Sequence, residues 1–189
     1  MRKQERPQDA LYYETRHLFM SQGDVFRDVP LSYPLPPREI VYDPDAPTGA
    51  RQFLAGPFET GYAMLLTPTC SMRAQQTTEA TYAHPVRVLA VIRSIAELID
   101  RGLFTPDRLG LLRKYDGLNN YMHLPALDAA GFPESVALLY MTVILHHDII
   151  EGQRITQLAY PAAQQMQRKL VLFSSGLPVD RNEFKPPMD

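Results

Sequence analysis

The stretch Gly61-Tyr62-Ala63-Met64-Leu65-Leu66-Thr67-Pro68-Thr69-Cys70-Ser71-Met72 joins an apolar run to a cluster of small polar residues that holds the only cysteine of the chain. The apolar part, Tyr62–Leu66, has the length and composition of a buried strand. Strand ends are common places for binding and catalytic side chains, because a rigid scaffold holds them there. We therefore expect a candidate binding site at the end of this strand. Its residues are Thr67, Thr69, Cys70 and Ser71, with Tyr62 and His84 beside them.

The composition is that of an ordinary globular protein without a bias toward one class of partner. The 189 residues are 45% hydrophobic and 21% charged, with a formal net charge of -2. This small charge gives no global attraction to nucleic acid or to anionic membranes. A single cysteine excludes an intrachain disulfide framework and a cysteine-rich zinc module, and it is typical of a reducing, cytoplasmic compartment.

The chain also lacks sequence signals for membrane insertion or secretion. No apolar run approaches the roughly 18 residues of a membrane span. Residues 1–7 are charged and lack the apolar core of a secretory signal. We therefore expect a cytoplasmic protein without a membrane partner.

Prolines divide the chain into a folded part and its extensions. The 17 prolines concentrate at residues 30–57 and 178–187. Proline cannot continue a helix or donate to a strand ladder, so these regions are expected to be loop and tail. We expect an N-terminal arm over residues 1–20, a single domain over 21–176 and a disordered tail over 177–189.

Short apolar segments predict a mainly β domain. The near-continuous β-branched run over Val86–Ile92 is typical of a central strand. Pro30 is expected to end the first strand or to mark it as an edge strand. The predicted strands are Val25–Leu31, Ile40–Tyr42, Tyr62–Leu66, Val86–Ile92, Tyr121–Pro125, Ser135–His146 and Gln153–Leu158.

Helical signals occur in two places. Thr105 and Pro106 have the residue types of an N-cap and a first helical position, and Gly102 is a natural helix terminator. These signals predict a helical insertion over residues 94–115. A C-terminal helix is predicted at about residues 160–174. Its apolar stripe comprises Ala162, Ala163, Met166, Leu170 and Phe173.

The order of these elements resembles that of a known family. Gly23-Asp24-Val25-Phe26 opens a first strand, one apolar strand ends in Leu66-Thr67, and a second, Val88–Ile92, is followed by Ser94. Ser135-Val136-Ala137-Leu138 and Gln153-Arg154-Ile155-Thr156 then precede the C-terminal helix. The chain thus resembles the MazF/PemK family of bacterial toxin–antitoxin systems over roughly residues 21–31, 60–95 and 134–173. The resemblance implies an SH3-like antiparallel β-barrel, with a homodimer as a candidate assembly.

The resemblance also implies two functions. The family toxins look like metal-independent ribonucleases, in which an arginine before the second apolar strand and a threonine or serine after the third act on the phosphodiester. Gly61-Tyr62 stands at the arginine position here, whereas Ser94 matches the hydroxyl position. The first reading is therefore a binding module that has lost the nuclease arginine, with an antitoxin-like or defence protein as its partner. The alternative is a divergent endoribonuclease that cleaves single-stranded RNA with Ser94 and with Arg93 or Arg27. Neither reading calls for a cofactor or a metal.

Cys70 and the histidine pair suggest further chemistry. A nucleophilic Cys70 needs a base such as His84, His123 or His146, but no family signature surrounds it, which favours an inert, buried or half-buried thiol. His146-His147-Asp148 suggests a metal site. Adjacent residues of one strand point to opposite faces, however, so we expect the two histidines not to share an ion.

A basic face with interleaved tyrosines is the candidate surface for single-stranded RNA. The acidic net charge argues against strong electrostatic binding to it. The cations are Arg87, Arg93, Arg113, Lys114, Arg154, Arg168 and Lys169, and the tyrosines are Tyr62, Tyr82, Tyr115 and Tyr121.

Overall fold

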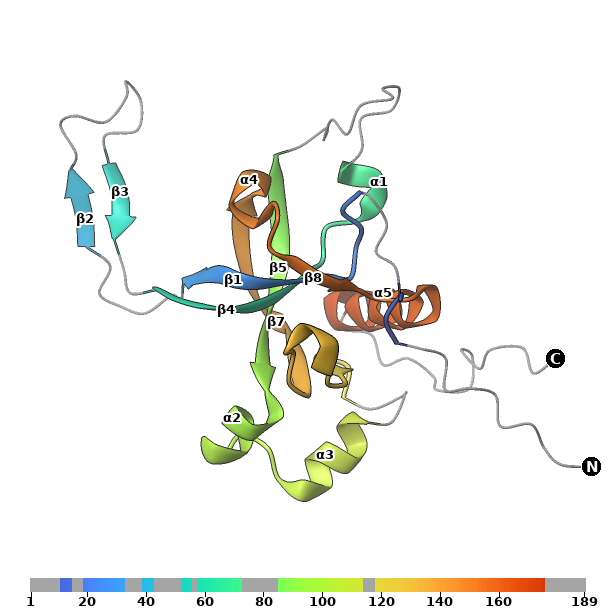
Figure 1. Ribbon diagram of the computed structural model, residues 1–189. Helices are drawn as coiled ribbons and strands as arrows, with labels where there is room; N and C mark the ends of the chain where they lie inside the picture. Colours follow the sequence, from blue (N-terminus) through green and yellow to red (C-terminus); the bar gives the residue numbers. More distant parts are fainter. Residues whose placement is uncertain are drawn as a thin grey trace, which may run out of the picture.

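The architecture is a curled antiparallel sheet of six strands in the order β6-β7-β5-β4-β1-β8 (Figure 1). The computed structural model describes residues 11–14, 19–32, 39–42, 52–55, 58–72, 85–113 and 118–175. The strands are β1 (Asp24–Ser32), β4 (Phe58–Leu65), β5 (Val86–Ser94), β6 (Tyr121–Leu124), β7 (Ser135–His146) and β8 (Arg154–Gln157). A separate two-stranded sheet joins β2 (Glu39–Tyr42) and β3 (Gln52–Ala55). The predicted mainly β, antiparallel fold is confirmed.

Irregular strand pairing accompanies the curl of the sheet. In Figure 1, β1, β4 and β8 cross the direction of β5. The pairing of β1 with β4 shifts register between Phe26 and Val29, and that of β5 with β7 shifts between Ala90 and Val91. Such bulges bend a strand and increase its local twist.

The central and edge positions of the strands follow the sequence pattern. β5 lies between β4 and β7, as its apolar composition predicted. Pro30 does not end β1, which continues to Ser32. It pairs with Thr60 of β4, whereas β8 pairs with β1 only from Asp24 to Phe26. Pro30 therefore stands on a portion of β1 that β8 does not reach, in agreement with its predicted edge position.

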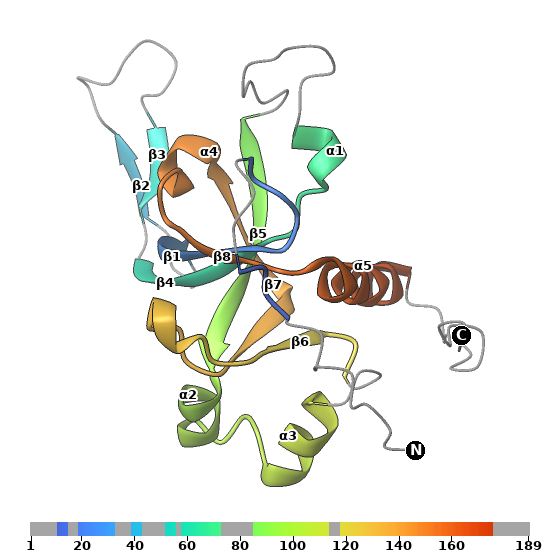
Figure 2. The same ribbon diagram turned by 45° about the vertical axis from the view of Figure 1, so that its right-hand side comes forward.

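Five α-helices occur within the described part of the chain. They are α1 (Thr69–Met72), α2 (Ile95–Asp100), α3 (Pro106–Leu112), α4 (His147–Ile150) and α5 (Tyr160–Ser175). The predicted helical insertion corresponds to α2 and α3, and the predicted C-terminal helix corresponds to α5. Figures 1 and 2 show α2 and α3 at one end of the sheet and α1 and α4 at the opposite end.

Apolar side chains are buried on both faces of the sheet. One face packs Val25, Met64, Ile92 and Ala137 against Met166 of α5. The opposite face holds two further clusters: one includes Phe26, Leu31, Leu89 and Val143, and the other joins α2 and α3 to Val136 and Leu138. The helix α5 thus covers one face, and the helical insertion covers one end of the other.

The stripe predicted on α5 is only partly buried. Ala162 and Met166 are buried, but Phe173 is 39% exposed. Lys169 is buried instead, because its Nζ donates to the carbonyl oxygen of Leu118 at 3.1 Å.

No described helix is both long enough and apolar enough to cross a bilayer. Most of the expected N-terminal arm and the expected tail over 177–189 lie outside the described residues.

Candidate functional site

Ser94 ends β5 and begins the helical insertion. Its backbone has φ -66° and ψ 148°, and its hydroxyl accepts a hydrogen bond from the amide of Glu97 at 3.1 Å. This is the geometry of a helix N-cap, which satisfies one of the free amides at the start of α2. The hydroxyl matched to the nuclease position therefore has a structural role in the folded chain.

Arg93 lies beside it and is paired with acidic side chains. Its guanidinium contacts the carboxylate of Glu59 and lies 3.3 Å from that of Glu97. The side chain is only 13% exposed. Burial lowers the pKa of Arg93, while the nearby Glu97 raises it and Arg101 lowers it further. Two carboxylates thus neutralise the cation that would have to replace the missing nuclease arginine.

Arg27, the other candidate for that role, lies on a different strand. It is exposed in the irregular part of β1, where its Nε is 3.6 Å from the carboxylate of Asp28. Asp28 itself has φ 53°, a left-handed conformation that aspartate tolerates better than most residues. No contact within the described part of the chain joins Arg27 to Ser94.

The polar cluster at the end of β4 also has structural partners. The hydroxyl of Thr67 accepts from the amide of Val88 at 2.8 Å, and that of Thr69 accepts from the amide of Gln22 at 3.0 Å. Cys70 is exposed, as is Ser71. The expectation of a buried or half-buried thiol at a strand end is wrong, because the chain forms the short helix α1 from Thr69 and leaves Cys70 on its outer side. His84 lies outside the described residues.

Tyr62 packs its ring edge against Phe132, with centroids 5.1 Å apart and an interplanar angle of 86°. Its hydroxyl donates to the carbonyl oxygen of Gly131 at 3.4 Å. Tyr62 therefore links β4 to the turn before β7.

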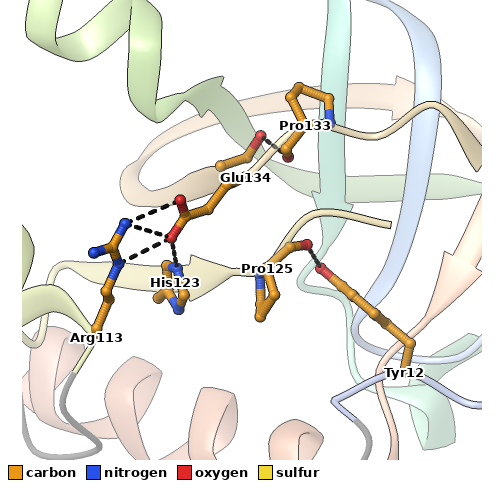
Figure 3. A network of polar contacts seen from close by, with 7 residues as sticks. Tyr12, Arg113, His123, Pro125, Pro133 and Glu134 are labelled. Carbon is orange, nitrogen blue, oxygen red and sulfur yellow. Dashed lines mark hydrogen bonds and ion pairs between the residues drawn. The ribbon is translucent and has the colours of Figure 1, made fainter. Parts of the chain in front are cut away.

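An ion-pair cluster that sequence reasoning missed lies where α3, β6 and β7 meet (Figure 3). Arg113 donates to both oxygens of Glu134, at 2.9 and 3.0 Å, and His123 Nε2 lies 2.8 Å from Oε1 of the same carboxylate. Burial raises the pKa of Glu134, but the hydrogen bond with His123 and the hydrogen bond and charge of Arg113 together outweigh it, so the pKa is lowered. The three residues are far apart in sequence and carry no spacing signal.

His146, His147 and Asp148 come together at the other end of β7. The interpretation that the two histidines share one strand is wrong, because β7 ends at His146 and α4 begins at His147. Their rings stack with centroids 4.7 Å apart. Ligand atoms of the three side chains all lie within 4.8 Å of one another. The strand-to-helix transition thus removes the alternation that was expected to separate them.

The expected basic face is reduced by burial. Arg87 is fully buried, and Lys169 is 5% exposed. Arg154 forms an ion pair of 2.8 Å with the buried carboxylate of Asp24. These three cations are buried or paired with a buried group, so they do not contribute to an exposed surface that could bind nucleic acid. Lys114, Tyr82 and Tyr115 of the same expectation lie outside the described residues.

The outer half of β7 forms one open edge of the described sheet. β6 pairs with β7 only from Ser135 to Leu138. Beyond that point, the described strands pair with β7 only on its β5 side. The apolar side chains of Val86 and Ile144 are 48% and 67% exposed there.

Comparisons with models of protein families and with curated proteins found no match to this chain.

Proposed function

We propose that this chain is a binding module that takes an extended segment of a partner protein as an added strand along the outer half of β7. We also propose that the fold is a barrel related to the MazF/PemK toxins and that the partner is an antitoxin-like or defence protein. The observation that carries the proposal is the open edge at Thr142–His146 beside exposed apolar side chains.

The two faces of this strand pair differ in a way that suits a partner strand. Leu89 and Val143 lie opposite each other and are buried in the core. The alternate cross-strand pair, Val88 and Ile144, lies on the other face, with Ile144 exposed. An added strand gains main-chain hydrogen bonds from the edge and side-chain contacts from this exposed face.

Monomeric proteins usually protect such an edge. Charged side chains, prolines or a covering segment are the common devices. The exposed positions along this part of β7 are instead Thr142 and Ile144, followed by His146. An edge of this composition favours pairing with another chain.

RNA cleavage is the less favoured function. The Ser94 hydroxyl caps α2, and Arg93 is paired with Glu59 and Glu97. Both groups would have to leave these partners to act on a phosphodiester. The described residues thus provide neither an unengaged hydroxyl nor an unpaired cation at this position.

The test uses the product of the adjacent gene as the candidate partner, co-expressed with this chain. We expect a stable complex in which the backbone amides of Thr142–His146 are protected from hydrogen exchange. The variant Ile144→Lys places a charge on the exposed face and should abolish the complex. Leu111→Lys, at a residue of α3 that is 47% exposed, is the matched control and should leave it intact.

Four results would contradict the proposal. Protection from hydrogen exchange that is confined to other elements would show that the partner binds elsewhere. A complex that is unchanged in Ile144→Lys would show that binding does not involve this edge. Self-association through β7, lost in Ile144→Lys, would identify a second copy of the chain as the occupant. Cleavage of single-stranded RNA without metal would favour the nuclease instead.

A further inference from the structure

We propose that His146, His147 and Asp148 form a binding site for a divalent transition-metal ion of the zinc class. This site adjoins the proposed partner edge, which ends at His146, but its argument does not rest on that edge. It comes from the geometry at the junction of β7 and α4.

The separations of the ligand atoms suit one small ion. His146 Nδ1 lies 3.1 Å from Asp148 Oδ2, and His147 Nε2 lies 2.8 Å from Asp148 Oδ1. Tetrahedral zinc ligands at about 2.0–2.2 Å from the metal lie roughly 3.3 to 3.5 Å from one another. The ligand atoms of all three side chains lie within 4.8 Å of one another, so binding one ion requires side-chain shifts of up to about 1 Å. The His146 and Asp148 side chains are 46% and 68% exposed, which leaves room for these shifts.

Nδ1 of His146 faces Asp148. This nitrogen lies 3.1 Å from carboxylate Oδ2 and 3.4 Å from the backbone amide nitrogen of Asp148. A ring nitrogen and a carboxylate oxygen, both common ligand atoms for zinc, thus stand close enough to bind one ion.

The second imidazole is oriented by the neighbouring strand. His147 Nδ1 lies 3.3 Å from the carbonyl oxygen of Pro85, which also accepts from the His147 amide at 2.8 Å. A proton on Nδ1 donates to that carbonyl and leaves the Nε2 lone pair directed at Asp148. Ligating histidines in proteins are commonly held in this way, by a hydrogen bond from the other ring nitrogen.

The ligand set selects a class of ion and leaves a position open. Two imidazoles and one carboxylate suit zinc, nickel, cobalt or copper, whereas magnesium and calcium prefer oxygen ligands alone. Structural zinc sites usually have four protein ligands, and three protein ligands leave a position for water or for an external donor. The site is therefore an open one.

The test measures Zn²⁺ binding to the chelator-treated full chain by calorimetry, with visible absorption of the Co²⁺ form as a second readout. We expect one ion per chain. Asp148→Asn and His146→Asn should each weaken binding by at least about tenfold. Asparagine at residue 146 retains a helix-capping acceptor, so the second variant removes the imidazole while preserving the start of α4.

Two control variants locate the ion. Asp128→Asn makes the same chemical change at an exposed carboxylate of the turn before β7 and should bind Zn²⁺ normally. Cys70→Ser removes the exposed thiol, an alternative zinc ligand, and should also bind normally. Thermal melting of each metal-free variant checks that it is folded.

The proposal is overturned if Zn²⁺ shows no saturable binding, or if folded Asp148→Asn and His146→Asn bind it as tightly as the wild type. Loss of binding in Cys70→Ser would place the ion at the thiol instead. Because only the isolated chain and the metal are used, these outcomes do not depend on any partner protein.

Discussion

A Cβ atom on Gly61 would lie 2.7 Å from Cδ1 of Leu31. Leu31 is fully buried, and Gly61 pairs with Val29 in the middle of the β1–β4 ladder. A side chain at residue 61 therefore requires Leu31 to move within a packed core. This contact gives a packing reason for glycine at the position where the toxin resemblance implies an arginine.

Gly61→Ala should destabilise the fold by about 1–3 kcal/mol, because it overpacks the contact with Leu31. Chemical denaturation measures the change as a lower unfolding midpoint. Gly110→Ala is the control: it lies in α3, and an added Cβ meets nothing within 4 Å. That change should stabilise by about 0.5–1 kcal/mol, since alanine is the better helix former. Equal effects of the two substitutions would show that the Leu31 contact is relieved at no cost.

Ser94→Ala should cost about 1 kcal/mol of stability, because α2 loses its capping oxygen. Ser94→Asp keeps a capping acceptor and removes the hydroxyl, so its stability should stay near that of the wild type. Unfolding midpoints of the three proteins provide the comparison. If Ser94→Asp is as unstable as Ser94→Ala, the hydrogen bond to Glu97 does not explain the role of this residue.

Arg154→Met should destabilise by about 3–5 kcal/mol, because it removes the cation paired with a buried carboxylate. The carboxylate of Asp24 belongs to a fully buried residue, and the Arg154 side chain is 17% exposed. The same change at Arg27, whose side chain is 58% exposed, should alter stability by no more than about 0.5 kcal/mol. Calorimetric melting of both variants tests the difference. A similar, small effect at both positions would mean that Asp24 is neutralised by other means.

Glu134 should stabilise the fold more at neutral than at acidic pH. Arg113 and His123 face its carboxylate, and its folded-state pKa is lowered from the usual 4.5. The stabilisation is therefore complete above about pH 4.5 and is lost as the pH falls through the lower, folded-state pKa. The side chain is 36% exposed, so solvent screening limits the effect to about 1 kcal/mol or less. Unfolding midpoints of wild type and Glu134→Gln should differ at neutral pH and converge in acid. A difference that persists at low pH would assign the effect to packing.

The sequence predicted the elements that have strong local signals. The β-branched run of β5 identified a central strand, the long apolar run of β7 identified the longest strand, and Thr105-Pro106 identified the start of α3. The four-residue helices α1 and α4 were missed, because a single turn has no measurable periodicity. That omission placed Cys70 at a strand end and the two histidines on one strand.

The candidate site was harder to predict than the fold. The ion pairs Arg93–Glu59 and Arg113–Glu134 join elements that are distant in sequence, so these partners depend on how the strands and helices pack together. The burial of Lys169 is a further example, since nothing in the apolar stripe of α5 indicates that a lysine faces inward. Side-chain roles of this kind follow from tertiary contacts and not from local pattern.

The pairing of β1 with β8 joins residues near the two ends of the described domain, since Asp24 lies opposite Gln157. During synthesis, the pairing of β1 with β8 can therefore form only after β8 has been made. The same holds for the ion pair between the buried carboxylate of Asp24 and Arg154. Contacts this distant in sequence slow folding, because a long loop must close before they form. A nascent chain also exposes unpaired strand edges while it waits. We therefore expect this protein to complete its sheet only once β8 has left the ribosome, and to depend on chaperones more than a domain with local strand pairing.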